Sequence, residues 1–198
     1  MAHISAILTA AGESTRMGRP KPLLLWHGVP LVEYQTTSLL EAGVAEVVVV
    51  LGYRHEIVSP HVRGQGVQQV LNPHYRRGRT TSIKAGLMAV GSDAAAVLLI
   101  AVDQPRPTHI ISAVTDSHLR SNALITSPRH RRRGGHPLVF SAALMGELQA
   151  ISEERQGIRE VFQVHRGEVN EVPIDDPVIL LDLNSPEAYE AARARYGA

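Results

Sequence analysis

Short apolar runs alternate with amphipathic stretches along the chain, and this alternation predicts its secondary structure. Runs rich in Val, Ile, Leu and Ala predict strands at residues 4–8, 44–51, 67–71 and 94–102. Weaker patterns predict further short strands at residues 124–126, 168–173 and 178–183. Because few polar residues interrupt the strong runs, we expect strands buried on both faces, as in a mostly parallel sheet.

Amphipathic helical patterns fill the intervals between these strands. They predict helices at residues 31–42, 80–90, 107–119, 141–150, 158–164 and 185–195. Pro30 precedes the first helix and Gly43 follows it, which matches the preference of proline for helix starts and of glycine for helix ends. Strand–helix alternation of this kind predicts an α/β fold in which helices cover both faces of the sheet.

Composition excludes several classes of protein. The 198 residues suit a single domain spanning 1–198, with no internal repeat or linker. The absence of cysteine excludes a disulfide framework, a thiol nucleophile and thiolate metal ligands, and it fits a reducing compartment. The net charge of +1 and the 4% aromatic content do not favour nucleic acid as a partner. No signal peptide or membrane-spanning run is found, so we expect a cytoplasmic protein without membrane association.

The polar loop after the first predicted strand carries the clearest chemistry. In order, this loop contains Ala10, Ala11, Gly12, Arg16 and Lys21. Small residues allow backbone N–H groups to approach an anion closely, and basic side chains supply the charge that phosphates require. The spacing matches neither the Walker A loop nor the dinucleotide fingerprint. The loop therefore indicates another type of triphosphate-binding turn, with an ordinary glycine turn beside two solvated cations as the alternative.

A carboxylate follows the most apolar predicted strand. Asp103 opens the segment Asp103-Gln104-Pro105 directly after residues 94–102. Ligands of open α/β sheets lie at the carboxyl ends of the strands, so we expect this side chain beside the first loop. Mg²⁺ takes one or two protein carboxylates and completes its shell with phosphate and water oxygens. Asp103 is therefore a candidate magnesium ligand, and capping the helix that begins near residue 107 is its alternative role.

Two further polar segments are candidates for ligand binding. Asn72-Pro73 leads through Gly78 to Ser82, where a helix start can hold an anion or present donors to a base. A capped helix with exposed arginines is the alternative there. Residues 128–137 are basic and rich in glycine, which predicts a loop that receives a phosphorylated second substrate. A nucleic-acid-binding arm and a plain solvated loop are the alternatives for this second segment.

These segments form a series of motifs. The series begins with Ala10-Ala11-Gly12-x-Ser14-x-Arg16-Met17-Gly18-x-x-Lys21 and Gly28-x-Pro30-Leu31. It continues with Asn72-Pro73, Gly78 and Ser82, then Asp103-Gln104-Pro105, Gly135-His136-Pro137 and Asp182-x-Asn184-Ser185-Pro186. The series resembles the signature of the MobA-like nucleotidyltransferases, and within them the branch that transfers cytidylyl groups to the molybdenum cofactor. The resemblance implies a Rossmann-like nucleotidyltransferase fold and Mg²⁺-dependent transfer of a nucleotidyl group.

The same resemblance implies roles for individual residues. The nucleotide-binding set would be Ala10, Ala11, Gly12, Arg16, Lys21, Asn72 and Ser82. The catalytic set would be Arg16, Lys21 and Asp103, with Asp103 as the principal Mg²⁺ ligand and Asp182 as a second one. The acceptor-binding set would be Arg133, Gly135 and His136.

The resemblance also implies the substrates. The Ala-Ala-Gly form of the first loop favours CTP, so the expected reaction transfers CMP to a molybdopterin-type acceptor and releases pyrophosphate. A molybdoenzyme or its chaperone is an expected further partner. Arg155 and Asn184 stand where the family has acids, and both positions lie on the acceptor side. Two alternatives therefore stay open: nucleotidyl transfer from GTP or another triphosphate to a sugar phosphate or other small acceptor, and a non-catalytic carrier of a nucleotide or cofactor.

Overall fold

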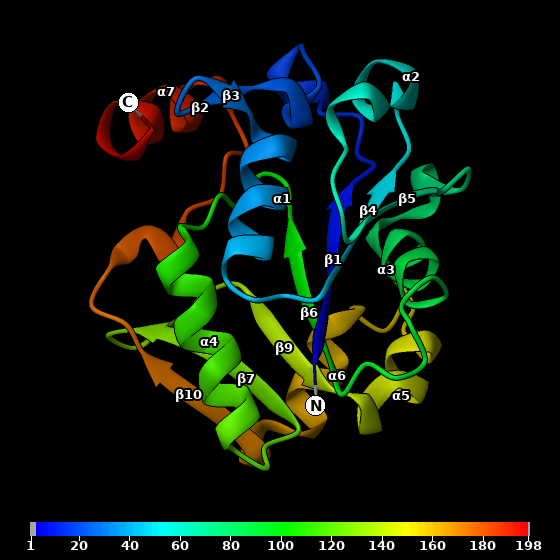
Figure 1. The fold of residues 1–198 in the computed structure, drawn as a ribbon, viewed down its shortest axis with the longest axis vertical. Helices are drawn as coiled ribbons and strands as arrows, with labels where there is room; N and C mark the ends of the chain where they lie inside the picture. The colour runs from blue at the N-terminus through cyan, green and yellow to red at the C-terminus, as the bar shows by residue number, and fades with distance from the viewer. Residues whose placement is uncertain (1–2, 198) are drawn as a thin grey trace.

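An eight-stranded sheet forms the centre of the fold. The computed structural model describes residues 3–197 and is shown in Figure 1. The strand order is β10-β7-β9-β6-β1-β4-β5, with β8 paired to β7. The strands are β1 (Ile4–Ala10), β4 (Glu46–Leu51), β5 (Val67–Leu71), β6 (Ala96–Ala101), β7 (Ile125–His130), β8 (Arg133–Gly134), β9 (Leu138–Ser141) and β10 (Val169–Pro173). A separate two-stranded ribbon consists of β2 (Leu25–Trp26) and β3 (Val29–Pro30).

The sheet is mostly parallel, as the apolar runs predicted. β1 lies between β4 and β6 and runs parallel to both, so that Thr9 is level with Val50 on one side and with Ala101 on the other. β9 is the antiparallel strand inserted between β6 and β7. The carboxyl ends of β1, β4 and β6 therefore open on the same edge of the sheet.

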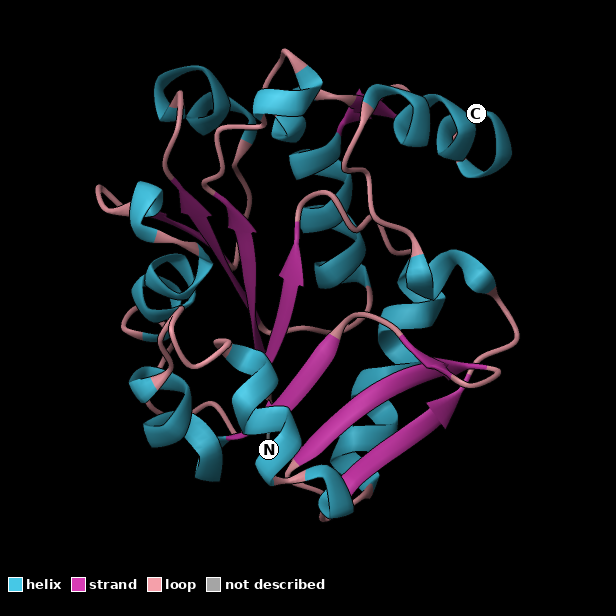
Figure 2. Cartoon of the chain, turned by 180° about the vertical axis from the view of Figure 1, so that it is seen from behind, coloured by secondary structure: helices cyan, strands magenta, loops and turns pink. Residues whose placement is uncertain are grey.

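Helices cover both faces of the sheet, which confirms the predicted α/β architecture. They are α1 (Leu31–Glu41), α2 (His55–Val58), α3 (Arg79–Leu87), α4 (Thr108–Arg120), α5 (Met145–Ala150), α6 (Ile158–Val164) and α7 (Pro186–Tyr196). Figures 1 and 2 view the sheet from opposite sides, and α1 and α4 lie in front of it in the first view and behind it in the second. None of the helices within residues 3–197 combines the length and apolar character needed to span a bilayer.

Successive side chains of the central strands point alternately into two apolar cores, one on each face of the sheet. In β1, Leu8 packs on the face covered by α1 and α4, whereas Ile7 packs on the face covered by α3, α5 and α6. The same alternation continues in the neighbouring strands, because successive residues of a strand point to opposite faces. The burial of both faces explains why these strands are apolar without interruption.

Two predicted elements differ in the structure. The strand predicted at residues 178–183 is wrong: Pro177–Leu180 forms a 3-10 turn, where Pro177 has no N–H to donate to a ladder and the Asp176 carboxylate accepts a hydrogen bond from the Val178 backbone N–H. The loop predicted at residues 128–137 is also wrong in part. β7 continues to His130, the chain turns at Arg131 with φ of 55°, and β8 returns along β7.

The pattern also missed the antiparallel strand β9. Its four residues precede the segment predicted to be helical at 141–150, in which Ser141 ends the strand and caps a 3-10 turn ahead of α5.

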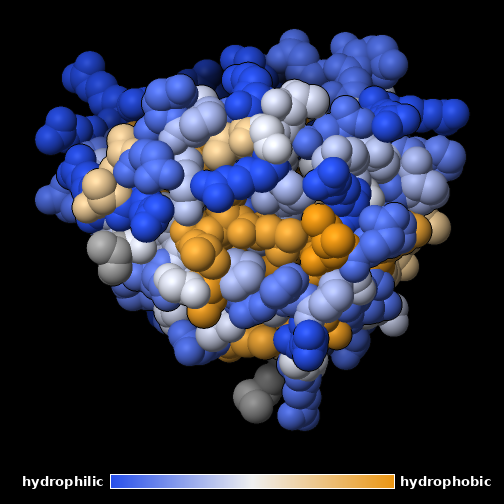
Figure 3. Space-filling view, turned by 90° about the horizontal axis from the view of Figure 1, so that it is seen from above, coloured by the Kyte–Doolittle hydropathy of each residue, from blue (hydrophilic) through white to orange (hydrophobic). Residues whose placement is uncertain are grey.

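Figure 3 views the molecule from above, onto the side toward which β1 points in Figure 1. Apolar residues form a band across this face and hydrophilic residues surround it.

Candidate functional site

Two adjoining cavities open at the carboxyl ends of β1 and β6. The loop cavity measures about 350 Å³ and is bordered by the first loop, the start of α3 and the end of β6. The apolar cavity measures about 410 Å³ and is bordered by β6, β9, α3 and α6. Thr9, Arg79 and Ala101 line both cavities. The structure therefore has room for two ligands side by side, at the edge of the sheet where open α/β folds bind them.

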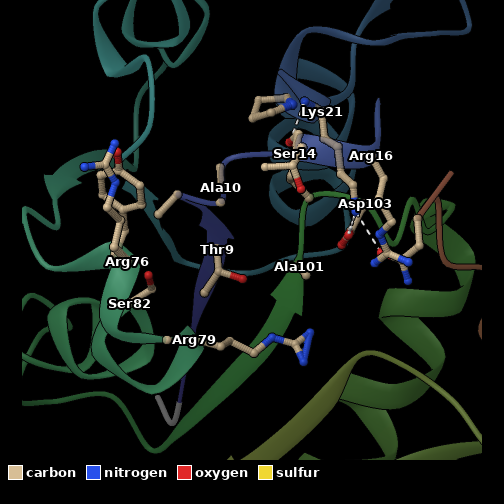
Figure 4. A pocket seen from close by; sticks show the side chains of 18 residues that line it. Thr9, Ala10, Ser14, Arg16, Lys21, Arg76, Arg79, Ser82, Ala101 and Asp103 are labelled. Atoms are coloured by element: carbon tan, nitrogen blue, oxygen red, sulfur yellow. Dashed lines mark hydrogen bonds and ion pairs between the residues drawn. The ribbon is translucent and has the colours of Figure 1, made fainter. Parts of the chain in front are cut away.

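The first loop folds back so that its basic side chains line the loop cavity. Ser14 and Gly18 adopt left-handed conformations on either side of a 3-10 turn, Thr15–Met17, and the buried Met17 anchors this turn in the core. The Ser14 hydroxyl accepts a hydrogen bond of 3.1 Å from the Lys21 backbone N–H. This closure brings Arg16 and Lys21 to the same cavity, as Figure 4 shows.

Ala10, Ala11 and Gly12 line the loop cavity at the end of β1. A side chain at Gly12 would meet no atom within 4 Å, so the glycine leaves open space that a ligand can fill. The backbone is tightly packed just behind this point. A side chain at Gly52 would lie 2.7 Å from the Ala11 carbonyl oxygen, and the Tyr53 N–H donates to that same oxygen at 3.0 Å.

Lys21, Asp103 and Asn184 form the polar centre of the loop cavity. The Lys21 ammonium donates to Asp103 Oδ2 at 2.5 Å and to Asn184 Oδ1 at 2.8 Å. The Lys21 and Asp103 side chains are only 14% and 17% exposed, so the surrounding protein shields this ion pair from solvent. The first loop, the end of β6 and the segment before α7 each contribute one of these residues. The sequence predicted Asp103 beside the first loop, as the structure shows. It placed Asn184 and Arg155 on the acceptor side, whereas the structure places Asn184 in the loop cavity with Lys21 and Arg155 in the lining of neither cavity.

Asp182 lies beside this centre without contacting Lys21. The Leu183 N–H donates to the Asp103 backbone carbonyl at 2.9 Å, which holds the 182–184 segment against the end of β6. The Asp182 side chain remains accessible to solvent. Partial burial of its carboxyl group and the nearby negative charge of Asp103 raise its pKa, and the positive charge of Lys21 opposes that shift. Two neighbouring carboxylates form a site that favours an added positive charge.

The residues present fit a magnesium ion. Asp103 Oδ2 and Asn184 Oδ1 converge on a single positive group, and carboxylate and amide oxygens are ligands that hard divalent cations accept. Within residues 3–197, no group of three or more His, Asp or Glu side chains is placed to hold a metal. A magnesium ion with one or two protein ligands and a phosphate-rich partner needs no such group.

Arg106 is a fully buried cation that organises the turn after β6, and the sequence reasoning missed it. Its guanidinium donates to four backbone carbonyl oxygens at 2.8–2.9 Å, those of Pro105, His136, Ile179 and Leu181. Burial lowers its pKa to about 9, although the negative charges of Asp182 and Asp103 oppose the shift. The group therefore stays protonated at neutral pH, and it ties three distant segments together behind Asp103.

Gln35 of α1 completes this support. Its amide nitrogen donates to the carbonyl oxygens of Ala101 and Gln104, and its amide oxygen accepts from the Arg106 backbone N–H. The Gln104 side chain in turn accepts from the Ala101 N–H at 3.2 Å. Because all of these groups are buried, the hydrogen bonds hold the Asp103 turn in one conformation.

The apolar cavity has a hydrocarbon lining with a polar edge. Its apolar side chains are Ile83, Leu99, Leu138, Ile158 and Phe162. His136 also lines it, and the Nδ1 atom of this residue is buried with no hydrogen-bond partner among the described residues. Burial lowers the pKa of His136 to about 4, and the charges of Arg106 and Arg79 contribute, so the imidazole is neutral at pH 7. Gly135 lines the same cavity, whereas Arg133 is exposed on β8 and does not.

Asn72 and Ser82 lie together, but only Ser82 lines the loop cavity. The Asn72 amide nitrogen donates to the hydroxyls of Thr81 and Ser82, and its amide oxygen accepts from the His74 N–H at 2.9 Å. Asn72 is therefore engaged in joining the end of β5 to the start of α3. Its place in the structure is that of a support for the residues that face the cavity.

The chain is similar to known proteins over most of its length. The profile of the MobA-like NTP transferase domain matches residues 6–169. The molybdenum cofactor cytidylyltransferase of Escherichia coli K12 is 29% identical over 198 residues, which cover 99% of this chain and 98% of that protein. The nicotine blue oxidoreductase of Paenarthrobacter nicotinovorans is 35% identical over 176 residues, which cover 79% of each chain.

A solved structure shares the same fold. Rv0371c from Mycobacterium tuberculosis H37Rv, determined in complex with manganese, superposes with a TM-score of 0.80. The alignment has 22% sequence identity and covers 98% of this chain and all of that one. At this level of identity the similarity shows a common fold.

Proposed function

Since the chain belongs to the MobA-like NTP transferase domain family and is a nucleotidyltransferase, we propose that it transfers CMP from CTP to a molybdopterin-type acceptor. The reaction releases pyrophosphate and uses Mg²⁺. The observation that carries this proposal is the Lys21–Asp103–Asn184 centre, which lies in the cavity formed by the Ala10-Ala11-Gly12 loop. A second cavity of suitable size for a small ring system adjoins it.

The loop cavity is the proposed site of the nucleoside triphosphate. The backbone around Gly12 can approach phosphate oxygens, and Arg16 and Lys21 supply positive charge from the same loop. On triphosphate binding, the Lys21 ammonium exchanges its contact with Asp103 for phosphate oxygens. Asp103 and Asn184 are then the protein ligands for Mg²⁺, with Asp182 as a further candidate. When bound there, Mg²⁺ supplies charge neutralisation to the triphosphate oxygens.

The chemistry needs no protein nucleophile. A phosphate oxygen of the acceptor attacks the α-phosphorus of CTP, the bond to the bridging oxygen breaks, and pyrophosphate leaves with the electron pair. Arg16 and Lys21 stabilise the negative charge that develops on the α-phosphate and on the leaving group, since both basic side chains line the loop cavity. The two cavities set the reacting groups side by side, which removes much of the entropic barrier of a bimolecular reaction.

Two observations support the choice of substrates. The E. coli relative, similar over nearly its whole length, is named a molybdenum cofactor cytidylyltransferase. The apolar cavity offers aliphatic and aromatic side chains to a planar ring, and its polar edge offers His136 and Gly135. A cytoplasmic location and delivery of the product to a molybdoenzyme belong to the same proposal.

Pyrophosphate release is the direct test. The wild-type protein is incubated with Mg²⁺, a molybdopterin acceptor and each of CTP, GTP, UTP and ATP in turn. We expect acceptor-dependent release with CTP and much slower release with the others. Release with GTP alone would contradict the cytidylyl assignment, and release with a sugar phosphate but not with molybdopterin would contradict the acceptor.

The same assay distinguishes two other functions. A carrier binds CTP in a calorimeter but releases no pyrophosphate with any acceptor. The second alternative function is a redox reaction, because the chain is similar to a protein named nicotine blue oxidoreductase. A redox reaction consumes no triphosphate and releases no pyrophosphate. Either result would contradict the proposed transfer.

A further inference from the structure

Arg79 occupies the boundary between the two cavities. It is the first residue of α3, and its side chain lines both the loop cavity and the apolar cavity. Thr9 and Ala101 are the other residues common to both, so Arg79 is the charged member of the shared set. Figure 4 shows its side chain extending from α3 below Thr9 toward the side of the cavity that holds Asp103.

The Arg79 guanidinium is not engaged by the rest of the protein. Within residues 3–197 it takes part in no hydrogen bond or ion pair, whereas Lys21 is paired with Asp103 and Arg76 with Glu13. Its charge nevertheless reaches both sides of the boundary, because it contributes to the lowered pKa of His136 in one cavity and opposes the rise in the pKa of Asp182 beside the other. Arg79 is an exposed cation that lines both cavities and has no partner among the described residues, so its guanidinium is available to an anion.

We propose that Arg79 binds the terminal phosphate of the acceptor and thereby selects acceptors that end in a phosphate monoester over neutral alcohols. The inference rests on the proposed nucleotidyl transfer, and it adds a residue that recognises the phosphate of the acceptor. A guanidinium matches two phosphate oxygens with two parallel N–H donors, and the third oxygen remains free to attack. That arrangement directs the nucleophile from the apolar cavity toward the α-phosphorus in the loop cavity.

The transfer step needs no additional base to remove a proton from the acceptor. The acceptor enters as a phosphate monoester carrying about −1.5 to −2 charges at pH 7, so its attacking oxygen has no proton to lose in the dianionic form. One P–O bond forms to the α-phosphorus, and the bond from the α-phosphorus to the bridging oxygen breaks. A neutral alcohol would need a base to remove its proton, and it would offer no negative charge to Arg79.

The inference can be tested without turnover, by measuring the binding of a simple aryl phosphate to the protein. Phenyl phosphate and benzyl alcohol are titrated into the wild-type protein, Arg79→Met, Arg79→Lys and the control Arg77→Met. Arg77 lies two residues before Arg79 and lines neither cavity. Calorimetry gives the affinities, and the amide NMR signals of Gly135 and Gly157, which line the apolar cavity, locate the ligand. CTP affinity is measured for each variant in parallel.

We expect the wild-type protein to prefer phenyl phosphate over benzyl alcohol and to lose about 10- to 100-fold in phenyl phosphate affinity on Arg79→Met, the effect of one charged hydrogen-bonding group. Arg79→Lys should recover part of the loss, and Arg77→Met should match the wild type. Equal affinity of the wild type for both probes would overturn the inference, as would a loss confined to CTP. If the pyrophosphate assay shows no CTP-dependent transfer while Arg79 still governs phosphate binding, the proposed function has failed and the anion site stands.

Discussion

The Lys21 ammonium lies 2.5 Å from the Asp103 carboxylate, although 82 residues separate them along the chain. Each residue alone has an ordinary explanation, as a solvated lysine in a turn or as a helix cap. Their contact shows that the fold brings the end of β6 and the first loop together. Each group serves as the counterion of the other, and under the proposed function a triphosphate with its metal ion would supply replacement partners for both.

Replacing Lys21 by alanine should slow pyrophosphate release by about 100-fold or more, because one preorganised charge donor to the reacting phosphates is lost. The measurement is kcat with saturating CTP and Mg²⁺. Lys84→Ala is the matched control, since Lys84 lies in α3 and lines neither cavity. Near-normal turnover of Lys21→Ala would contradict its assignment.

Asp103→Asn should abolish the stimulation of activity by Mg²⁺, because the substitution removes the carboxylate while it retains the shape of the side chain. A titration of activity against Mg²⁺ concentration measures this effect. Asn184→Ala should raise the Mg²⁺ concentration needed for half activity, and Asp182→Asn distinguishes whether Asp182 contributes. An Asp103→Asn protein with unchanged Mg²⁺ dependence would show that the metal ion binds elsewhere.

Arg106→Met should destabilise the protein by roughly 3 kcal/mol or more, because it leaves four buried carbonyl oxygens without their donor. Urea unfolding monitored by circular dichroism gives the free energy of unfolding. Arg120→Met provides the control, since Arg120 is exposed at the end of α4. Equal destabilisation by both substitutions would argue against a special role for Arg106.

Acid should destabilise the fold through His136. Its pKa falls from the ordinary value of 6.5 to about 4 in the folded protein, so the unfolded chain takes up this proton first as the pH drops. The loss of stability begins near pH 6.5 and is complete near pH 4, with a contribution of roughly 3 kcal/mol from this group. Unfolding free energies measured at several pH values should show a smaller slope for His136→Phe.

The comparison for this prediction is His109→Phe, which changes an exposed histidine at the start of α4. It should leave the pH dependence of stability unchanged. His118 is also buried with a lowered pKa, so part of the acid sensitivity will persist in His136→Phe. An identical pH profile for the wild type and His136→Phe would show that the imidazole is not held neutral by the fold.

The sequence by itself determined the layered α/β architecture, because uninterrupted apolar runs require burial on both faces and helical patterns supply the cover. It also determined that the loops bearing Gly12, Lys21 and Asp103 lie together, since these residues follow strands whose carboxyl ends must meet at one edge. These inferences rest on local periodicity and on topology, both of which can be read along the chain.

The tertiary structure decided the rest. Asn184 contacts Lys21 from 163 residues away, and no local pattern encodes such a contact. The direction of β9 depends on its pairing with β6 and β7, and four apolar residues are compatible with either direction. Arg106 reads as an ordinary surface cation until four carbonyl groups surround it. The shared position of Arg79 exists only where two cavities meet, because the ends of separate strands and helices form that boundary through packing.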